Sequence, residues 1–155
     1  MKLLRLFKLL APALLLVMSL QSYATAAAAG QSDPSPNGSM KPVQVFDVAA
    51  GKVVKTIPND KEFQQHAQSW IKSITGLAPN MTSDKSCSYV FRVPLSKAVS
   101  VKVNEVSVVT DDLFLFYCKD KPPLLLLFDE KRRPYLFLFK EDIAPFLKKA
   151  GITVS

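Results

Sequence analysis

Few side chains in this sequence are of a kind that could do acid–base, nucleophilic or metal chemistry. The chain has one histidine, His66, and two cysteines, Cys87 and Cys118. Nucleophilic catalysis needs a serine or cysteine beside a histidine and an orienting acid, and no serine here stands in a glycine-framed elbow. His66 borders the apolar face of a predicted helix beside Phe63 and Trp70, which favours a structural role. A zinc site needs four closely spaced ligands, so the sequence predicts no catalytic residue, metal ligand or cofactor.

Three pairs of adjacent carboxylates are the other candidates for chemistry: Asp111 with Asp112, Asp129 with Glu130, and Glu141 with Asp142. Neighbouring residues of an extended chain point to opposite faces, and each pair lies near a predicted turn or helix start. Solvated turns and favourable helix-dipole contacts account for these carboxylates. A hydrolase that pairs two of them across a sheet is the enzymatic alternative.

The N-terminal segment predicts export from a bacterial cell. Residues 1–8 carry three basic side chains and no acidic one, residues 9–20 are nearly all apolar, and residues 22–29 are mostly small. This order is that of a secretory signal peptide, with cleavage after residue 24 or up to about residue 28. The apolar run is shorter than the roughly 20 residues of a membrane span. An uncleaved anchor is the alternative, and after cleavage we expect no transmembrane span.

Removal of residues 1–24 takes away three of the 20 basic residues and none of the 13 acidic ones, so the net charge falls from +7 to +4. That excess is too small for a nucleic-acid-binding footprint. Residues 25–42 are rich in small residues, Pro and Gly and predict a flexible leader. Residues 43–155 suffice for a single domain with its own core.

The two cysteines predict a disulfide. An exported protein folds in an oxidising compartment, where an even number of cysteines favours bridging. The bond between Cys87 and Cys118 would close a loop of about 30 residues. Two buried thiols are the alternative interpretation.

Hydrophobic periodicity predicts the first half of the domain. Residues 43–48 and 53–57 flank a short loop and predict a β-hairpin. Apolar residues at helical spacing then predict a helix that Asn59 caps and Gly76 ends. Strands follow at 87–93, which Pro94 ends, and at 98–109, where the alternation changes phase after Glu105.

Three dense apolar runs, at residues 113–117, 124–128 and 135–139, predict an antiparallel meander. A final helix begins after a cap at Asp142 and ends at Gly151. The predicted fold is therefore α+β, in which an antiparallel sheet made of the N-terminal hairpin and the C-terminal three-stranded meander packs with one long and one short helix.

The meander does not alternate apolar and polar residues, as a strand with one wet face would. Its second face must therefore be covered by the helices and first hairpin, or by a partner or a second copy of the chain. The basic group at residues 131–133 lies between the last two predicted strands. It forms either a solvated turn or a contact for an anionic polymer, lipid headgroup or acidic protein. The candidates for a partner surface are Phe114, Phe116, Lys131, Arg132, Arg133, Tyr135 and Phe137.

Three segments carry a resemblance to a known group of proteins: residues 51–59, 70–77 and 127–137. They resemble small exported proteins of spore-forming Gram-positive bacteria, similar to those of the Bacillales. The resemblance covers most of the predicted domain, and its motifs are a hairpin, a capped helix and a meander. It implies a location at the cell envelope, and it assigns no functional residues to this sequence.

From these observations we expect a secreted, extracytoplasmic protein of the cell envelope. Its predicted role is a non-enzymatic binding or interaction module, and a small secreted hydrolase or hydrolase inhibitor is the alternative. The expected partner is an envelope protein or an anionic component of wall or membrane, with a homodimer as a further option and no nucleic acid.

Overall fold

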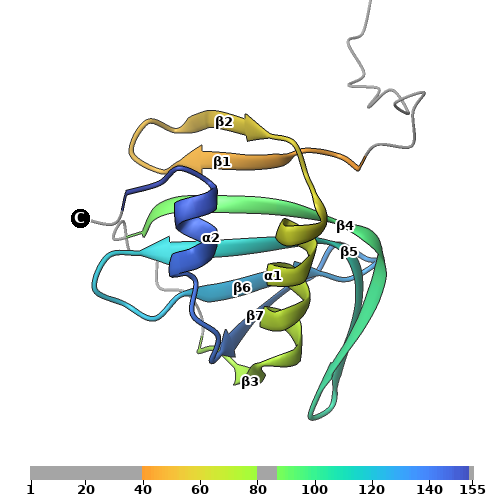
Figure 1. The fold of residues 1–155 in the computed structure, drawn as a ribbon. Helices are drawn as coiled ribbons and strands as arrows, with labels where there is room; N and C mark the ends of the chain where they lie inside the picture. The colour runs from red at the N-terminus through yellow and green to blue at the C-terminus, as the bar shows by residue number, and fades with distance from the viewer. Residues whose placement is uncertain (1–39, 80–86, 154–155) are drawn as a thin grey trace, which may run out of the picture. The chain divides into compact units, whose positions relative to one another are not determined.

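In the part of the chain that the structure describes, seven antiparallel strands form one sheet, and two helices lie on one of its faces (Figure 1). The computed structural model describes residues 40–79 and 87–153, which belong to one compact unit. The predicted signal peptide and nearly all of the predicted leader lie outside the described residues. The prediction of an α+β fold built on an antiparallel sheet is confirmed.

The strands are β1 (Val43–Asp47), β2 (Lys52–Ile57), β3 (Ile74–Leu77), β4 (Cys87–Val103), β5 (Val106–Cys118), β6 (Leu124–Phe128) and β7 (Pro134–Phe139). The helices are α1 (Lys61–Lys72) and α2 (Ala144–Lys149). The strand order across the sheet is β2-β1-β4-β5-β6-β7-β3, so β2 and β3 form its two edges.

The predicted arrangement of a hairpin, a separate meander and one long helix does not match the structure. The centre of the sheet is the β4–β5 hairpin, whose strands have 17 and 13 residues and which joins the N-terminal and C-terminal strands. Helix α1 has only 12 residues, and the segment that follows it forms the edge strand β3. Pairing with β7 therefore takes residues that local periodicity had assigned to the helix.

Pro94 bends β4 and does not end it. The β4–β5 register shifts between Pro94 and Val99, as at a bulge. A bulge is one of the few places in a sheet where proline is accepted, because it donates no ladder hydrogen bond. The predicted phase change at Glu105 is the hairpin turn, where Asn104 has a φ of 52°. We call residues 95–111, the part of this hairpin beyond Pro94, the arm.

Asp60, and not Asn59, caps α1. The Asp60 carboxylate accepts hydrogen bonds from the backbone N–H groups of Glu62 and Phe63, both at 3.0 Å. The Asn59 side chain instead donates to the backbone carbonyl oxygen of Pro94 at 2.8 Å. Asn59 thus contacts the bend of β4, while the neighbouring Asp60 accepts hydrogen bonds from the free N–H groups of the helix.

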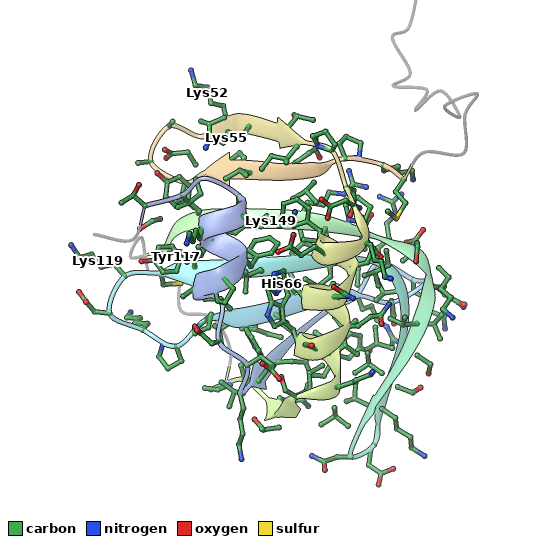
Figure 2. The ribbon with its side chains drawn as sticks, in the orientation of Figure 1. Lys52, Lys55, His66, Tyr117, Lys119 and Lys149 are labelled. Atoms are coloured by element: carbon green, nitrogen blue, oxygen red, sulfur yellow. A yellow bond between two sulfur atoms is a disulfide. The ribbon has the colours of Figure 1, made fainter. Side chains whose placement is uncertain are left out.

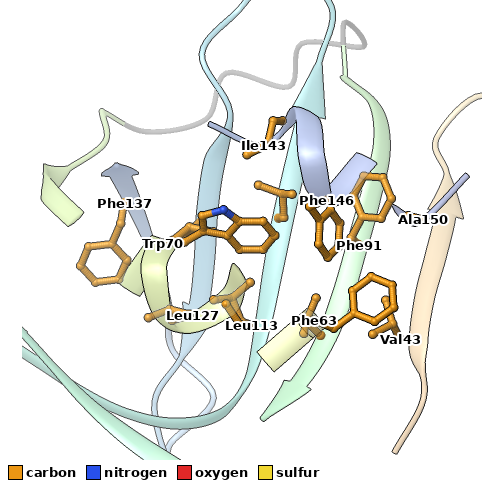
Figure 3. Packing of buried hydrophobic residues seen from close by; sticks show 14 of the residues in the cluster. Val43, Phe63, Trp70, Phe91, Leu113, Leu127, Phe137, Ile143, Phe146 and Ala150 are labelled. Carbon is orange, nitrogen blue, oxygen red and sulfur yellow. The ribbon is translucent and has the colours of Figure 1, made fainter. Parts of the chain in front are cut away.

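A cluster of aromatic rings forms the centre of the core between the helices and the sheet (Figure 3). The ring of Phe146 from α2 lies 4.7 Å from Trp70, 5.3 Å from Phe63 and 5.2 Å from Phe91, measured between centroids. All four residues are at most 1 % exposed. One side chain of a six-residue helix thus contacts both α1 and the central strand β4.

His66 packs at the border of this cluster. Its ring stacks on Trp70 with 6.1 Å between centroids and meets Phe146 edge-on at 5.9 Å. Its Nε2 atom is buried and has no hydrogen-bond partner among the described residues. The contacts of His66 are therefore those of an aromatic packing residue.

The end of α2 is hydrogen-bonded to the edge strand β2. Lys55 of β2 donates hydrogen bonds from its ammonium group to the carbonyl oxygens of Ala150, at 3.2 Å, and Gly151, at 2.6 Å. Gly151 has a φ of 66°, and a Cβ there would lie 2.8 Å from the Lys55 Nζ. Glycine at this position therefore permits the left-handed conformation that ends the helix, and it leaves room for the Lys55 ammonium group.

Lys149 joins the last turn of α2 to the first turn of α1 (Figure 2). Its ammonium group lies 2.8 Å from an Asp60 carboxylate oxygen and 2.7 Å from a Glu62 oxygen, and 4.8 Å above the ring centre of Phe63. The hydrogen bond from Lys149 lowers the pKa of Asp60 below its ordinary value, and the same bond raises the pKa of Lys149.

Replacing Lys149 with methionine is expected to lower the melting temperature at pH 7. Because the pKa of Asp60 is lower in the folded state, this stabilisation is complete above its ordinary value of 3.8 and is lost as the pH falls below it. Thermal unfolding of wild type and variant at pH 7 and pH 3 tests this. Lys148→Met is the matched control, and equal losses in the two variants would contradict the role of Lys149.

Candidate functional site

The face of the sheet opposite the helices is largely apolar. A row of five directly paired residues marks the helix side: Val45, Phe91, Leu115, Leu125 and Phe137, each 0 % exposed. Because successive side chains of a strand alternate between the two faces, the sequence neighbours of this row point the other way.

These neighbours form two adjacent rows. One row pairs Phe46, Val90, Phe116 and Leu124 across four strands. The next row pairs Gln44, Arg92, Phe114, Leu126 and Leu136 across five strands. We call the surface that these nine residues form the open face.

No helix of the described residues covers the open face, since both lie on the other side of the sheet (Figure 1). Phe46 is 37 % exposed, and the other eight residues are half-buried. Val53 of β2, which pairs with Phe46, is 47 % exposed and extends the apolar surface to the sheet edge. The open face is therefore an apolar surface with partial access to solvent.

An ion pair stands within the open face. The Arg92 guanidinium donates two hydrogen bonds to the Asp112 carboxylate, at 3.1 Å from Nε and 2.7 Å from Nη2. A third, longer hydrogen bond of 3.4 Å reaches the side-chain oxygen of Gln44. The hydrogen bond to Asp112 raises the pKa of Arg92, so this residue stays charged and is fixed in place.

A cleft of about 700 Å³ opens at one end of the open face, between the arm and the β6–β7 turn. Strands β5 and β6 pair only through residues 114–116 and 124–126, and beyond these they separate. The rings of Phe114 and Phe128 line the cleft and meet edge-to-face, with 5.5 Å between centroids. The cleft thus continues the apolar surface beyond the paired strands.

Four carboxylates line this cleft: Asp111, Asp112, Asp129 and Glu130. Arg92 holds Asp112, and Arg133 donates to Asp129 at 2.6 Å. Desolvation raises the pKa of Asp129, but the backbone N–H and guanidinium of Arg133 outweigh it, so the net shift is downward. A general acid of a hydrolase needs a raised pKa, so Asp129 is suited to shaping the turn and not to donating a proton.

The seven residues predicted as a partner surface do not lie together. Phe114 and Phe116 are on the open face, as described above. Phe137 is fully buried on the helix side, which corrects its assignment to a surface, and Tyr135 pairs with the buried Leu127 on that same side. The cause is alternation, because odd-numbered and even-numbered residues of β7 face opposite ways.

The predicted basic group forms an exposed turn around Asp129. The backbone N–H groups of Lys131 and Arg133 both donate to the Asp129 carboxylate, at 2.9 Å and 2.8 Å. Arg132 between them has a φ of 59°. Arg132 lines the cleft of the open face, and Lys131 and Arg133 line a smaller hollow beside it, of about 160 Å³. Carboxylates therefore lie directly beside the basic side chains of this turn.

The predicted disulfide between Cys87 and Cys118 is present. It joins the first residue of β4 to the last residue of β5, which are direct partners in the ladder. The bond therefore closes the base of the central hairpin, at the end opposite the arm.

Sequence reasoning missed several residues of the open face, notably Phe46, Arg92, Leu126 and Leu136. Arg92 had a signal that could have been used, because it is the one charged residue within a run of apolar strand residues. Leu126 and Leu136 had no such signal. Strand β6, for example, is apolar at every position, so the sequence does not show which of its residues face which side of the sheet.

Within residues 40–79 and 87–153, no group of three or more His, Cys, Asp and Glu side chains is placed to hold a metal ion. The helices of this same part of the chain are too short or too polar to cross a membrane. No protein-family model, no curated protein and no solved structure matches this chain.

Proposed function

We propose that this chain is a non-enzymatic binding module, exported to the bacterial cell envelope, whose open face binds an apolar patch on another envelope protein. The observation that carries the proposal is the pair of adjacent rows of side chains that no described helix covers. Apolar surface that is removed from water contributes about 25 cal/mol per Å², so such a face favours association.

Export is supported by the order of charged, apolar and small residues in the first 29 positions. The Cys87–Cys118 bond is consistent with it, because disulfides persist mainly in oxidising compartments. We therefore place the binding event outside the cytoplasm. Mass spectrometry of the N-terminus of the secreted product tests this step, and recovery of an intact residue 1 would contradict it.

The composition of the open face favours a protein partner. Aromatic residues and arginine are enriched in protein–protein interfaces relative to other surface, and the open face carries Phe46, Arg92, Phe114 and Phe116. Its ion pair is already hydrogen-bonded internally. A partner can therefore cover Arg92 and Asp112 without leaving either charge unpaired.

The test is site-specific photo-crosslinking in the native cells. A photoreactive amino acid at Leu126, on the open face, is expected to give a discrete covalent adduct with one envelope protein. The same amino acid at Gln65, an exposed position of α1, is expected to give none. Equal labelling from the two positions would overturn the proposed face.

A charge-introducing variant sharpens the test. Phe116→Lys should abolish the Leu126 adduct, because a charge buried at an apolar interface is strongly unfavourable. Val54→Lys is the control, since Val54 is an apolar residue of β2 that is 41 % exposed and outside the two rows. The crosslinking experiment should use only variants whose circular dichroism and thermal unfolding are cooperative and native-like.

A further inference from the structure

A second cleft, away from the open face, lies between α1 and the bend of β4. Its volume is about 400 Å³. The bend is where the β4 register shifts after Pro94, and in Figure 1 the strand curves past α1 at this point. The cleft therefore has one wall from the helix and one from the arm.

Two amide side chains hold these walls together. Gln64 of α1 is 6 % exposed, and its amide nitrogen donates to the Pro94 carbonyl oxygen at 2.8 Å. The Gln64 side-chain oxygen accepts from the backbone N–H of Ser96 at 2.9 Å. Asn59 donates to the same Pro94 carbonyl oxygen. Because every polar atom of the Gln64 amide that faces the bend is bonded, the helix and the arm are fixed relative to each other.

The charged residues that line this second cleft are both lysines, Lys72 from α1 and Lys97 from the arm. Among the described residues no carboxylate lines this second cleft, in contrast to the cleft of the open face. Both lysines are exposed, and the described residues contain no carboxylate within ion-pair distance of either. The cleft is therefore locally cationic from two sides.

Neutral side chains complete the lining. Gln68, Ser96 and Ser100 supply amide and hydroxyl groups that can donate hydrogen bonds. Apolar carbon is supplied by half-buried residues of both walls: Ile71, Leu95 and Val99. A pocket with an apolar lining and a few convergent polar groups is the usual form of a small-molecule site, and its volume falls in the usual range.

We infer that this cleft binds a phosphate ester of a polyol. Lysine ammonium groups act as compact point charges for phosphate, the hydroxyl and amide groups suit the polyol oxygens, and the apolar carbon packs against the carbon skeleton. The same chemistry occurs in a soluble polyol-phosphate polymer and in a glycerophospholipid headgroup. This site is separate from the protein-binding open face and stands or falls independently of it.

Titration of the isotope-labelled domain with glycerol 3-phosphate, followed by two-dimensional NMR, tests the inference. We expect saturable shifts confined to the backbone signals of residues 68–72 and 96–100, and none with uncharged glycerol. The double variant Lys72→Gln, Lys97→Gln should bind at least about tenfold more weakly, because two charge-assisted contacts are lost. The matched control is Lys52→Gln, Lys119→Gln, whose lysines project from the far turns of the sheet (Figure 2).

Shifts that do not saturate, or equal weakening in both double variants, would overturn the inference in favour of non-specific attraction to a basic protein. A saturable response then allows the two sources to be separated. Oligomeric glycerol phosphate that competes with glycerol 3-phosphate supports a polymer ligand. Co-sedimentation with phosphatidylglycerol vesicles, and not with phosphatidylcholine vesicles, supports a lipid headgroup, provided that the Lys72 and Lys97 variant abolishes it.

Discussion

Replacing Phe146 with alanine is expected to lower the free energy of unfolding by about 3–5 kcal/mol, the usual cost of truncating a fully buried aromatic residue. The Phe146 ring is 0 % exposed and contacts Phe63, Trp70 and Phe91. Among the described residues, no other buried side chain contacts as many aromatic rings. Helix α2 has six residues, too few to be helical without tertiary contacts. The loss of this ring should therefore release α2 as well as leave a cavity.

Urea denaturation of wild type and variant measures this loss, and hydrogen exchange of the backbone amides at 146–150 measures the release of α2. Phe46→Ala is the control, because Phe46 is the same residue type at 37 % exposure on the open face. Its expected cost is below about 1 kcal/mol, as for most exposed positions. Similar costs for the two variants would show that the aromatic cluster is not the centre of the core.

Removal of the disulfide is the second change with a large expected effect. The Cys87→Ser, Cys118→Ser variant should be roughly 3–4 kcal/mol less stable, because the bond closes a loop with a sequence separation of 31 residues and restricts the unfolded chain. Thermal unfolding with and without a reducing agent measures this loss. The wild type should lose stability on reduction, and the double variant should not respond.

Whether the wild type loses stability in the presence of the reducing agent distinguishes two explanations for a destabilised double variant. If the double variant is less stable but the wild type is insensitive to reductant under unfolding conditions, the cause is the new serine at Cys118, which is 4 % exposed. Cys87→Ala, Cys118→Ala separates these effects, since it removes the bond without burying a hydroxyl group. Full stability in this alanine variant would contradict a stabilising role for the bridge.

The strands of this fold were predictable where local signals were strong. The run at 124–128 and the first hairpin contain β-branched and large apolar residues between turn residues, and both form strands. The disulfide between the two cysteines was predictable from their even number together with the predicted signal peptide. These signals depend only on the chain within a short window or on composition, so they need no knowledge of the fold.

The predictions were wrong where contacts with a distant part of the chain determine the local structure. Ile74 continues the apolar spacing of α1 and Gly76 resembles a helix end, yet both pair with β7 as part of β3. Pro94 has the local character of a strand end, but hydrogen bonds from Asn59 and Gln64 to its carbonyl oxygen hold it within β4 as a bend. Tertiary hydrogen bonding outweighs local propensity at these positions.

The open face was only partly predictable for a related reason. In a fully apolar strand the phase of alternation is invisible, so Phe116 and Phe137 are equivalent in the sequence. The register with neighbouring strands assigns them to opposite faces. The second cleft had no sequence signal, because its two lysines are 25 positions apart and meet through the bend.

The position of α2 has a consequence for when the protein can fold. Its Phe146 fills the centre of the core, and the last residues of the same helix bind Lys55, which lies 95 positions earlier in the chain. A chain that emerges from its N-terminus therefore cannot complete this core until residues 146–150 are free. Contacts between such distant segments slow folding. The domain should thus stay incompletely folded until the segment that forms α2 has been synthesised, because that segment carries the ring at the centre of the core.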